Sequence, residues 1–118
     1  MIVGIVGMTH SSDPKIELRA HMVFNRLSQR EGVQFVTTLD DGIADIIGRL
    51  AQRTKMPLQY APTLDDVLEV ADNVIIIHDG TERKWRLFAM RCLAKGMTVD
   101  YRTFYTTDRS DELWSISK

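Results

Sequence analysis

The junction at residues 74–81 constrains the fold of this chain more than any other part of its sequence. Four aliphatic residues, VIII, run there directly into the polar residues HDGT, and a helix-patterned segment follows at once. A β-branched run that is apolar on every side is typical of a strand buried on both faces, as in the centre of a parallel sheet. In open α/β sheets, ligands bind at the carboxyl ends of such strands. The junction therefore indicates where the protein acts.

The composition fits a single globular domain and excludes several classes of partner. The chain has 118 residues, of which 44% are hydrophobic and 26% are charged. Fifteen basic and sixteen acidic side chains give a formal charge of −1, which provides no basic surface for nucleic acid and no polybasic arm for a membrane. The apolar start lacks the basic region of a signal peptide, and no stretch approaches the roughly 20 apolar residues of a membrane span. We therefore expect a cytoplasmic protein that binds neither nucleic acid nor membranes.

The histidine and cysteine content predicts no metal site and no cofactor. Three histidines and one cysteine form no cluster with the spacing of metal ligands. Cys92 has no partner for an intramolecular disulfide, and its helical context predicts a buried packing role.

Strand-like and helix-like segments alternate along the chain. The predicted strands cover residues 2–6, 33–37, 56–60, 74–77 and 98–104, the last with the alternating character of an edge strand. The predicted helices start at Pro14 with Asp13 as N-cap and end near Gly32, follow a cap at Asp40 or Asp41, cover residues 63–70 behind a capping-box-like start, and run from about Trp85 to Gly96. In the second of these helices the predicted inner face is Ile43, Ile46, Ile47, Leu50 and Ala51.

This alternation predicts right-handed crossovers and a sheet covered on both faces. We expect an α/β fold, a compact three-layer Rossmann-like domain of about five mostly parallel strands with helices on both faces. The domain should cover residues 1–105. Residues 106–118 should form a C-terminal tail that is either mobile or docked through Trp114.

Three strand-to-helix turns carry unusual polar density, at residues 7–13, 37–42 and 78–81. Parallel strands would place all three turns on the same rim of the sheet. If the first and fourth strands are neighbours, a crevice opens between residues 7–10 and 79–81. Each turn leads into a helix N-terminus, whose N–H groups and dipole favour a phosphate or a carboxylate. The alternative is that these are ordinary short turns with capping residues.

The acidic residues of these turns bear on what such a site could hold. Asp40, Asp41 and Asp79 would repel an anion, but carboxylates suit the hydroxyls of a ribose or the edge of a base. The basic residues that follow the last turn, Arg83, Lys84 and Arg86, would either supply positive charge to the site or form a solvated helix face.

Two of the histidines lie in these turns, where they could act as acid–base groups or serve as structural hydrogen-bonding residues. His10 and His78 carry imidazoles whose ordinary pKa lies near neutrality. His21 falls in the middle of a predicted helix and is expected at the surface. The sequence contains no G-x-G-x-x-G fingerprint after the first strand, no P-loop and no H-E-x-x-H pattern.

Three segments together resemble the SLOG superfamily, which joins the DNA-processing Smf/DprA proteins and the LOG, or lysine-decarboxylase-like, phosphoribohydrolases. They are IVGIVGMTHSSDP, TTLDDGIADIIGRLAQRTKMPL and ADNVIIIHDGTERKWRLFAMRCLAKGMTV. The likeness covers about residues 2–104 and is nearest to small single-domain members of bacteria and phages. In that family a Gly-Ser-Arg-like turn, a Gly-Gly-Ala-x-Gly-Ala-Asp turn and a strand ending in Asp-Gly correspond to residues 7–10, 40–45 and 79–80. Here Asp40 and Asp41 replace the paired glycines, and ERKW replaces the phosphate turn beyond Gly80.

The resemblance and the turns together predict a protein that binds a nucleotide or a nucleotide-derived small molecule, in order to sense or sequester it. Backbone N–H groups after Gly7 and Gly80 would hold phosphate, and Asp41, Asp45 or Asp79 would hold ribose. The predicted ligand-binding residues are Gly7, Met8, Thr9, His10, Asp40, Asp41, Gly42, Asp45, Asp79, Gly80, Thr81 and Arg83.

Two alternatives remain open. The first is an enzyme that acts on an N-glycosidic bond, as a nucleotide phosphoribohydrolase or a deoxyribosyltransferase does. Its catalytic residues would be Asp79 or Glu82 together with His10 or His78. The second is an interaction module that forms a homodimer or a higher homo-oligomer, with exposed Trp85, Tyr105 or Trp114 as anchors.

Overall fold

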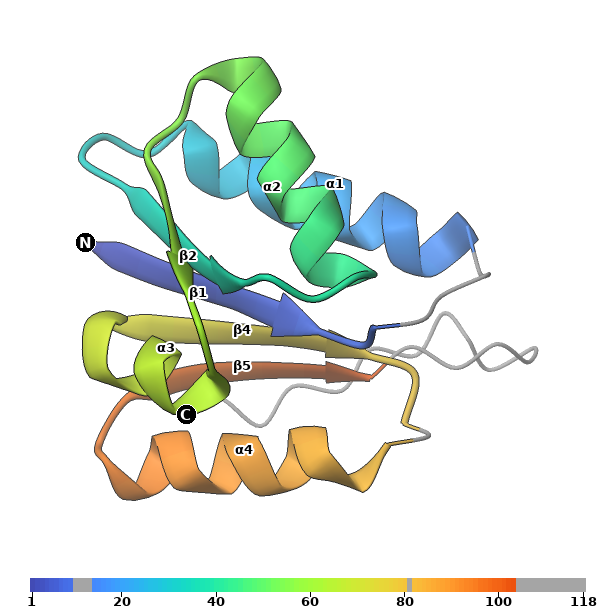
Figure 1. Cartoon of the computed structure of the whole chain (residues 1–118), viewed down its shortest axis with the longest axis vertical. Coiled ribbons are helices and arrows are strands. Elements are labelled where there is room, and N and C mark those ends of the chain that lie inside the picture. The colour runs from blue at the N-terminus through green and yellow to red at the C-terminus, as the bar shows by residue number, and fades with distance from the viewer. Residues whose placement is uncertain (10–13, 81, 104–118) are drawn as a thin grey trace.

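Strands and helices alternate strictly along the chain in the computed structural model, which describes residues 1–9, 14–80 and 82–103, the last three as backbone only (Figure 1). The strands are β1 (Ile2–Gly7), β2 (Gln34–Thr38), β3 (Leu58–Ala61), β4 (Asn73–His78) and β5 (Thr98–Thr103). The helices are α1 (Pro14–Ser28), α2 (Ile43–Thr54), α3 (Leu64–Val70) and α4 (Arg83–Ala94).

The five strands form one parallel sheet with the order β3-β2-β1-β4-β5. The fold class is therefore confirmed, and every strand pairing is parallel. β1 and β4 are neighbours, with Gly7 opposite Ile77, as the crevice hypothesis requires. β5 lies at one edge of the sheet, which confirms the interpretation of its alternating sequence.

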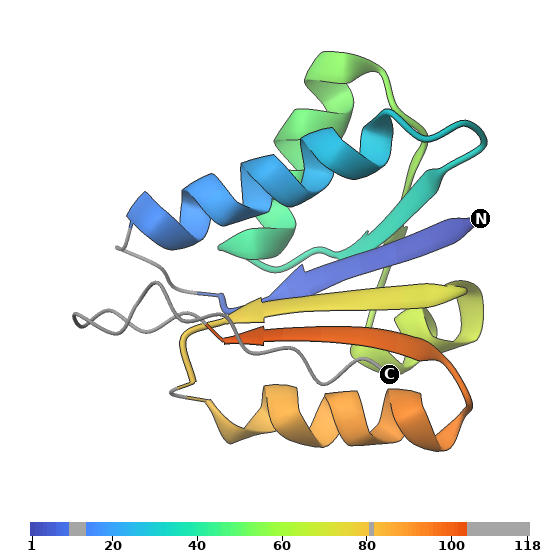
Figure 2. The same cartoon turned by 180° about the vertical axis from the view of Figure 1, so that it is seen from behind.

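The two faces of the sheet bury separate clusters of apolar side chains because successive residues of a strand point to opposite faces. Ile75 and Ile77 belong to the cluster beneath α1 and α2. Val74 and Ile76 belong to the cluster beneath α3 and α4. Figures 1 and 2 show the resulting three layers, with α1 and α2 above the sheet and α3 and α4 below it. The aliphatic run at residues 74–77 is thus an interior strand buried on both faces, as its sequence predicts.

Several predicted boundaries were wrong by a few residues. α1 ends at Ser28 rather than near Gly32, and a turn in which the Arg30 N–H donates to the Leu27 carbonyl follows it. β3 begins at Leu58 rather than Met56, because the Met56 N–H still donates to Ala51 and closes the end of α2. Strong apolar periodicity locates an element better than it locates the ends of that element.

The start of α2 also differs from the prediction. Its N-cap is Gly42, with φ of 74°, and no side chain caps the helix, so neither Asp40 nor Asp41 has that role. Within the predicted inner face of this helix, Ile46 is only partly buried. The start of α3 is as predicted: the Thr63 hydroxyl accepts a hydrogen bond from the Asp66 N–H at 3.2 Å.

The tail at residues 106–118, including Trp114, lies outside the described residues, and so does the predicted N-cap Asp13. Among the helices of the described part, none combines the length and the apolar character that a membrane crossing requires.

Candidate functional site

The carboxyl ends of β1 and β4 lie side by side at one rim of the sheet. The Met8 N–H donates to the Ile77 carbonyl at 3.0 Å, which continues the pairing of the two strands past Gly7. From this rim the chain after β1 leads to α1 on one face of the sheet, and the chain after β4 leads to α4 on the other (Figure 1). Such a reversal is the topological switch point at which open α/β sheets form a binding crevice.

The turn after β2 packs closely against the turn after β1. A β-carbon on Gly42 would lie 2.2 Å from the carbonyl oxygen of Met8, so only glycine fits at this position. The Ile43 N–H donates to that same carbonyl at 3.0 Å. Two of the three predicted turns are therefore joined through their backbones. This junction occupies the carbonyl group of Met8 and the first N–H group of α2.

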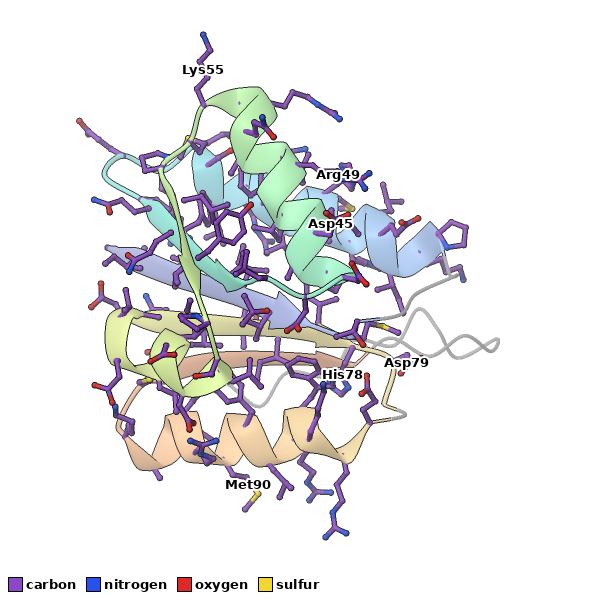
Figure 3. The ribbon with its side chains drawn as sticks, viewed as in Figure 1. Asp45, Arg49, Lys55, His78, Asp79 and Met90 are labelled. Atoms are coloured by element: carbon purple, nitrogen blue, oxygen red, sulfur yellow. The ribbon has the colours of Figure 1, made fainter. Side chains whose placement is uncertain are left out.

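Two of the three carboxylates predicted at residues 40–45 contact neighbouring side chains. Asp40 accepts a hydrogen bond from the Thr38 hydroxyl at 2.8 Å. Asp45 forms an ion pair with Arg49, one helical turn away, at 2.9 Å (Figure 3). Asp41 is exposed. The structure thus brings the backbone of this turn to the rim of the sheet, while two of the three carboxylates contact groups on their own segment.

His78 is the last residue of β4 and is almost fully buried, with 1% of its surface exposed. Its Nδ1 accepts a hydrogen bond from the Gly80 N–H at 3.0 Å, which leaves the proton of the neutral ring on Nε2. Burial lowers the pKa of His78 from 6.5 to about 4, and the nearby carboxylates of Asp79 and Glu82 only partly oppose this shift. The imidazole is therefore uncharged at neutral pH.

Asp79 follows His78 and is partly exposed at the end of β4, where Figure 3 shows it beyond the last paired residue of the strand. Gly80 has φ of 86°, a conformation that favours glycine. Thr81 and His10 lie outside the described residues, so their predicted roles stay predictions.

Glu82, the N-cap residue of α4, is held on its own helix. Its carboxylate lies 3.7 Å from the Lys84 ammonium and 3.4 Å from the indole nitrogen of Trp85. The Lys84 ammonium also lies 4.7 Å from the centre of the Trp85 ring. Arg83, the first residue of α4, is exposed.

The prediction that Trp85 is an exposed anchor was wrong. Only 1% of its surface is accessible, and its ring packs in the cluster between the sheet and α4. The indole lies on the inner face of an amphipathic helix, where a large aromatic side chain contributes most to burial. The other two anchors, Tyr105 and Trp114, lie outside the described residues.

Two features near the sheet escaped the sequence-based interpretation. The buried Thr37 hydroxyl donates to the Ile5 carbonyl at 2.7 Å and ties β2 to β1 just below the rim. A surface pocket of about 450 Å³ lies away from the rim, between α2 and β3. It is lined by Gly48, Ala51, Gln52, Lys55, Met56, Pro57, Leu58 and Tyr60. An isolated glycine within a helical pattern, Gly48, was the only signal of this pocket in the sequence.

Neither a search for metal-binding clusters nor comparisons with known proteins point to a ligand for this site. Among the described residues, no group of three or more His, Cys, Asp or Glu side chains could hold a metal ion. Comparisons with protein-family models, with curated proteins and with solved structures gave no match to this chain. The resemblance to the SLOG superfamily therefore stays a prediction.

Proposed function

We propose that this protein binds a nucleotide or a nucleotide-derived small molecule at the rim of the sheet, in the crevice between the ends of β1 and β4. The observation that carries the proposal is the adjacency of these two strands together with the departure of α1 and α4 to opposite faces. Ligands of open α/β sheets bind at this position because side chains and helix termini converge there without a covering helix.

The start of α4 is the best candidate for the phosphate end of such a ligand. The N-cap residue Glu82 makes no side-chain capping hydrogen bond to this helix, whereas Thr63 caps α3. Uncapped N–H groups and the helix dipole favour an anion. The Met8 N–H is already bonded to Ile77, so we assign no phosphate contact to it and place the contribution of β1 at Thr9.

The carboxylate of Asp79 is the best candidate for the ribose end. It lies at the carboxyl end of β4 and is partly exposed. A carboxylate has acceptor capacity for two vicinal hydroxyls in addition to other bonds that it makes. This division places the anionic end of the ligand at the helix and its neutral diol at the acid.

Isothermal titration with adenosine, AMP, ADP, ribose 5-phosphate and inorganic phosphate tests the proposal. We expect AMP or ADP to bind more tightly than either adenosine or inorganic phosphate, because adenosine lacks the phosphate and inorganic phosphate lacks the ribose. Loss of a hydrogen bond to a charged group should make binding to Asp79→Asn about tenfold weaker. Glu31→Gln, a matched change at an exposed residue before the amino end of β2, should leave binding unchanged. Absence of heat with the whole panel would count against the proposal.

No geometric observation favours the enzymatic alternative in the same way. The Glu82 carboxylate is held by Lys84 and Trp85, and the His78 ring is buried and uncharged. Release of free base from nucleoside monophosphates, followed by chromatography, separates catalysis from binding. An Asp79→Asn variant that loses release but keeps nucleotide binding would favour the enzyme.

A further inference from the structure

The outer face of α4 carries an apolar stripe that no described residue covers. Leu87, Met90 and Leu93 are 49%, 57% and 38% exposed. They are spaced three residues apart, so their side chains are neighbours along the helix. Figure 3 shows Met90 pointing away from the sheet. Contiguous exposed apolar surface of this kind marks a contact site.

Two cations that have no acidic partner among the described residues lie beside this stripe. α4 contains four basic residues and no acidic residue. Arg91 pairs with Asp65 of α3, and Lys84 pairs with Glu82. Arg83 and Arg86 are exposed and have no acidic partner among the described residues. They precede Leu87 and Met90 by one helical turn, so basic and apolar groups share one face of the helix.

The C-terminal segment of the same chain has the complementary composition. Its sequence DELWSI at residues 111–116 places two acids directly before Leu113, Trp114 and Ile116. From Leu113 to Ile116 an extended chain spans about 10 Å. From Leu87 to Leu93 a helix rises about 9 Å. The order of acids and apolar residues thus matches the order of cations and apolar residues along α4.

The connection is also long enough. β5 ends at Thr103, which is paired with His78 at the rim, and α4 begins at the same rim with Arg83. The seven residues 104–110 reach about 23 Å when extended. That length suffices to turn from the edge strand β5 around to the first turn of α4. The following residues would then run along α4 away from the rim.

We propose that residues 111–116 dock on the outer face of α4 of the same chain, with Asp111 and Glu112 on Arg83 and Arg86 and with Trp114 on the stripe of Leu87, Met90 and Leu93. Docking covers the apolar stripe and neutralises both cations. The β5 edge of the sheet and the start of α4 then have the C-terminal segment as their neighbour.

Acrylamide quenching of tryptophan fluorescence in the full chain tests the docking. Trp85 is 1% exposed, so quenching by an aqueous agent reports on Trp114. We expect Trp114 to be shielded in the native chain. The double variant Arg83→Glu/Arg86→Glu should increase quenching severalfold and shift the emission to the red. Additional Asp111→Arg/Glu112→Arg changes should restore the shielding. Arg26→Glu/Arg30→Glu, an equal charge change at exposed positions in α1 and the turn after it, should have no effect.

Disulfide formation gives a second readout that does not depend on fluorescence. Met90→Cys with Ser115→Cys should form a disulfide within one chain under mild oxidation, whereas Met22→Cys on α1 with Ser115→Cys should not. Cys92 is fully buried and does not interfere. Native quenching of Trp114 equal to that in the urea-unfolded chain would overturn the proposal. A disulfide that joins the cysteines introduced at positions 90 and 115 of two different chains would equally overturn it, because the occupant would then be a second copy.

Discussion

A β-carbon on Gly7 would lie 2.1 Å from the carbonyl oxygen of Ile77. The ends of β1 and β4 approach so closely at the point where the proposed crevice opens that no side chain fits between them. The same hypothetical atom would lie 2.9 Å from Ile43 at the start of α2. Three elements of the rim therefore converge on one glycine.

Replacement of this glycine should destabilise the protein. Gly7→Ala forces backbone atoms apart, and we expect the free energy of unfolding in urea to fall by about 1–3 kcal/mol, as in overpacked cores. Gly48→Ala is the matched control. Its new methyl group meets only the hydroxyl of the half-exposed Tyr60, which can move, and alanine favours the helix by up to about 1 kcal/mol. Equal losses in the two variants would contradict this account.

Burial of His78 should make the fold sensitive to acid. The folded chain protonates this ring near pH 4 and the unfolded chain near pH 6.5, so falling pH favours the unfolded state within this window. The His78 contribution is intact above pH 6.5 and declines by about 1.4 kcal/mol per pH unit below it, to a total loss of about 3 kcal/mol. Urea unfolding at both ends of the window measures the decline. His78→Gln should reduce the pH dependence, and His21→Gln on α1 should retain it.

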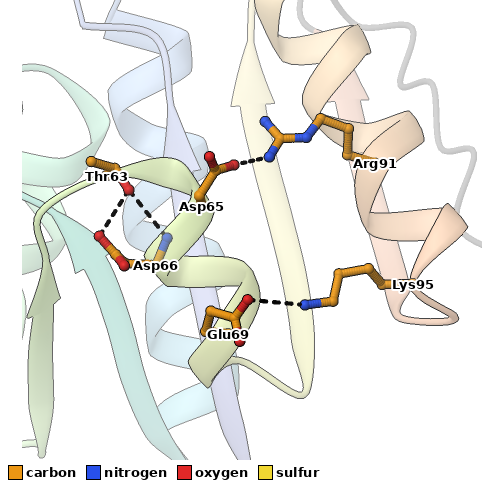
Figure 4. A network of polar contacts seen from close by, with 6 residues as sticks. All are labelled: Thr63, Asp65, Asp66, Glu69, Arg91 and Lys95. Carbon is orange, nitrogen blue, oxygen red and sulfur yellow. Dashed lines mark hydrogen bonds and ion pairs between the residues drawn. The ribbon is translucent and has the colours of Figure 1, made fainter.

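The polar contacts of α3 should differ in strength (Figure 4). The Thr63 hydroxyl accepts from the Asp66 N–H and donates to the Asp66 carboxylate at 2.8 Å, so Thr63→Ala should cost about 1 kcal/mol of unfolding free energy. The exposed ion pairs Asp65–Arg91 and Glu69–Lys95 join α3 to α4. Removal of either pair should cost at most about 1 kcal/mol and less at high salt. A larger loss for Lys95→Ala than for Thr63→Ala would reverse this ranking.

Cys92 should be chemically inert in the folded protein. Burial raises the pKa of its thiol to about 11, and the nearby cations Arg91 and Lys95 only partly oppose the shift. Because the thiolate is the reactive form, a disulfide reagent such as DTNB should label Cys92 only after unfolding in urea. Rapid labelling of the native chain at neutral pH would show that α4 opens readily.

Much of the fold follows from local patterns in the sequence. The apolar run at residues 74–77 fits a strand buried on both faces, and the helical spacing of residues such as Phe88 and Cys92 fits one buried stripe. These patterns depend on the two periods of the backbone, which are the same in every protein. Element ends were less predictable, because a few competing hydrogen bonds decide them, such as the bond from Met56 to Ala51.

The candidate site was predictable in its position and not in its side chains. Parallel strands bring the turns at residues 7–9, 40–42 and 79–80 to one rim, as expected. No local pattern reveals that the Met8 N–H is already bonded to Ile77 or that the Met8 carbonyl accepts from the Ile43 N–H. Each of these outcomes depends on which neighbour another segment supplies.

The sequence alone therefore determined the α/β class, the strand at residues 74–77 that is buried on both faces, and the rim at which polar turns gather, because burial and backbone periodicity act within short segments. Only the tertiary structure decided which donors and carboxylates of that rim are bonded to their neighbours and which face of α4 no described residue covers. Those properties arise from contacts between residues far apart in the chain, such as Gly7 with Ile77 and Gly42 with Met8.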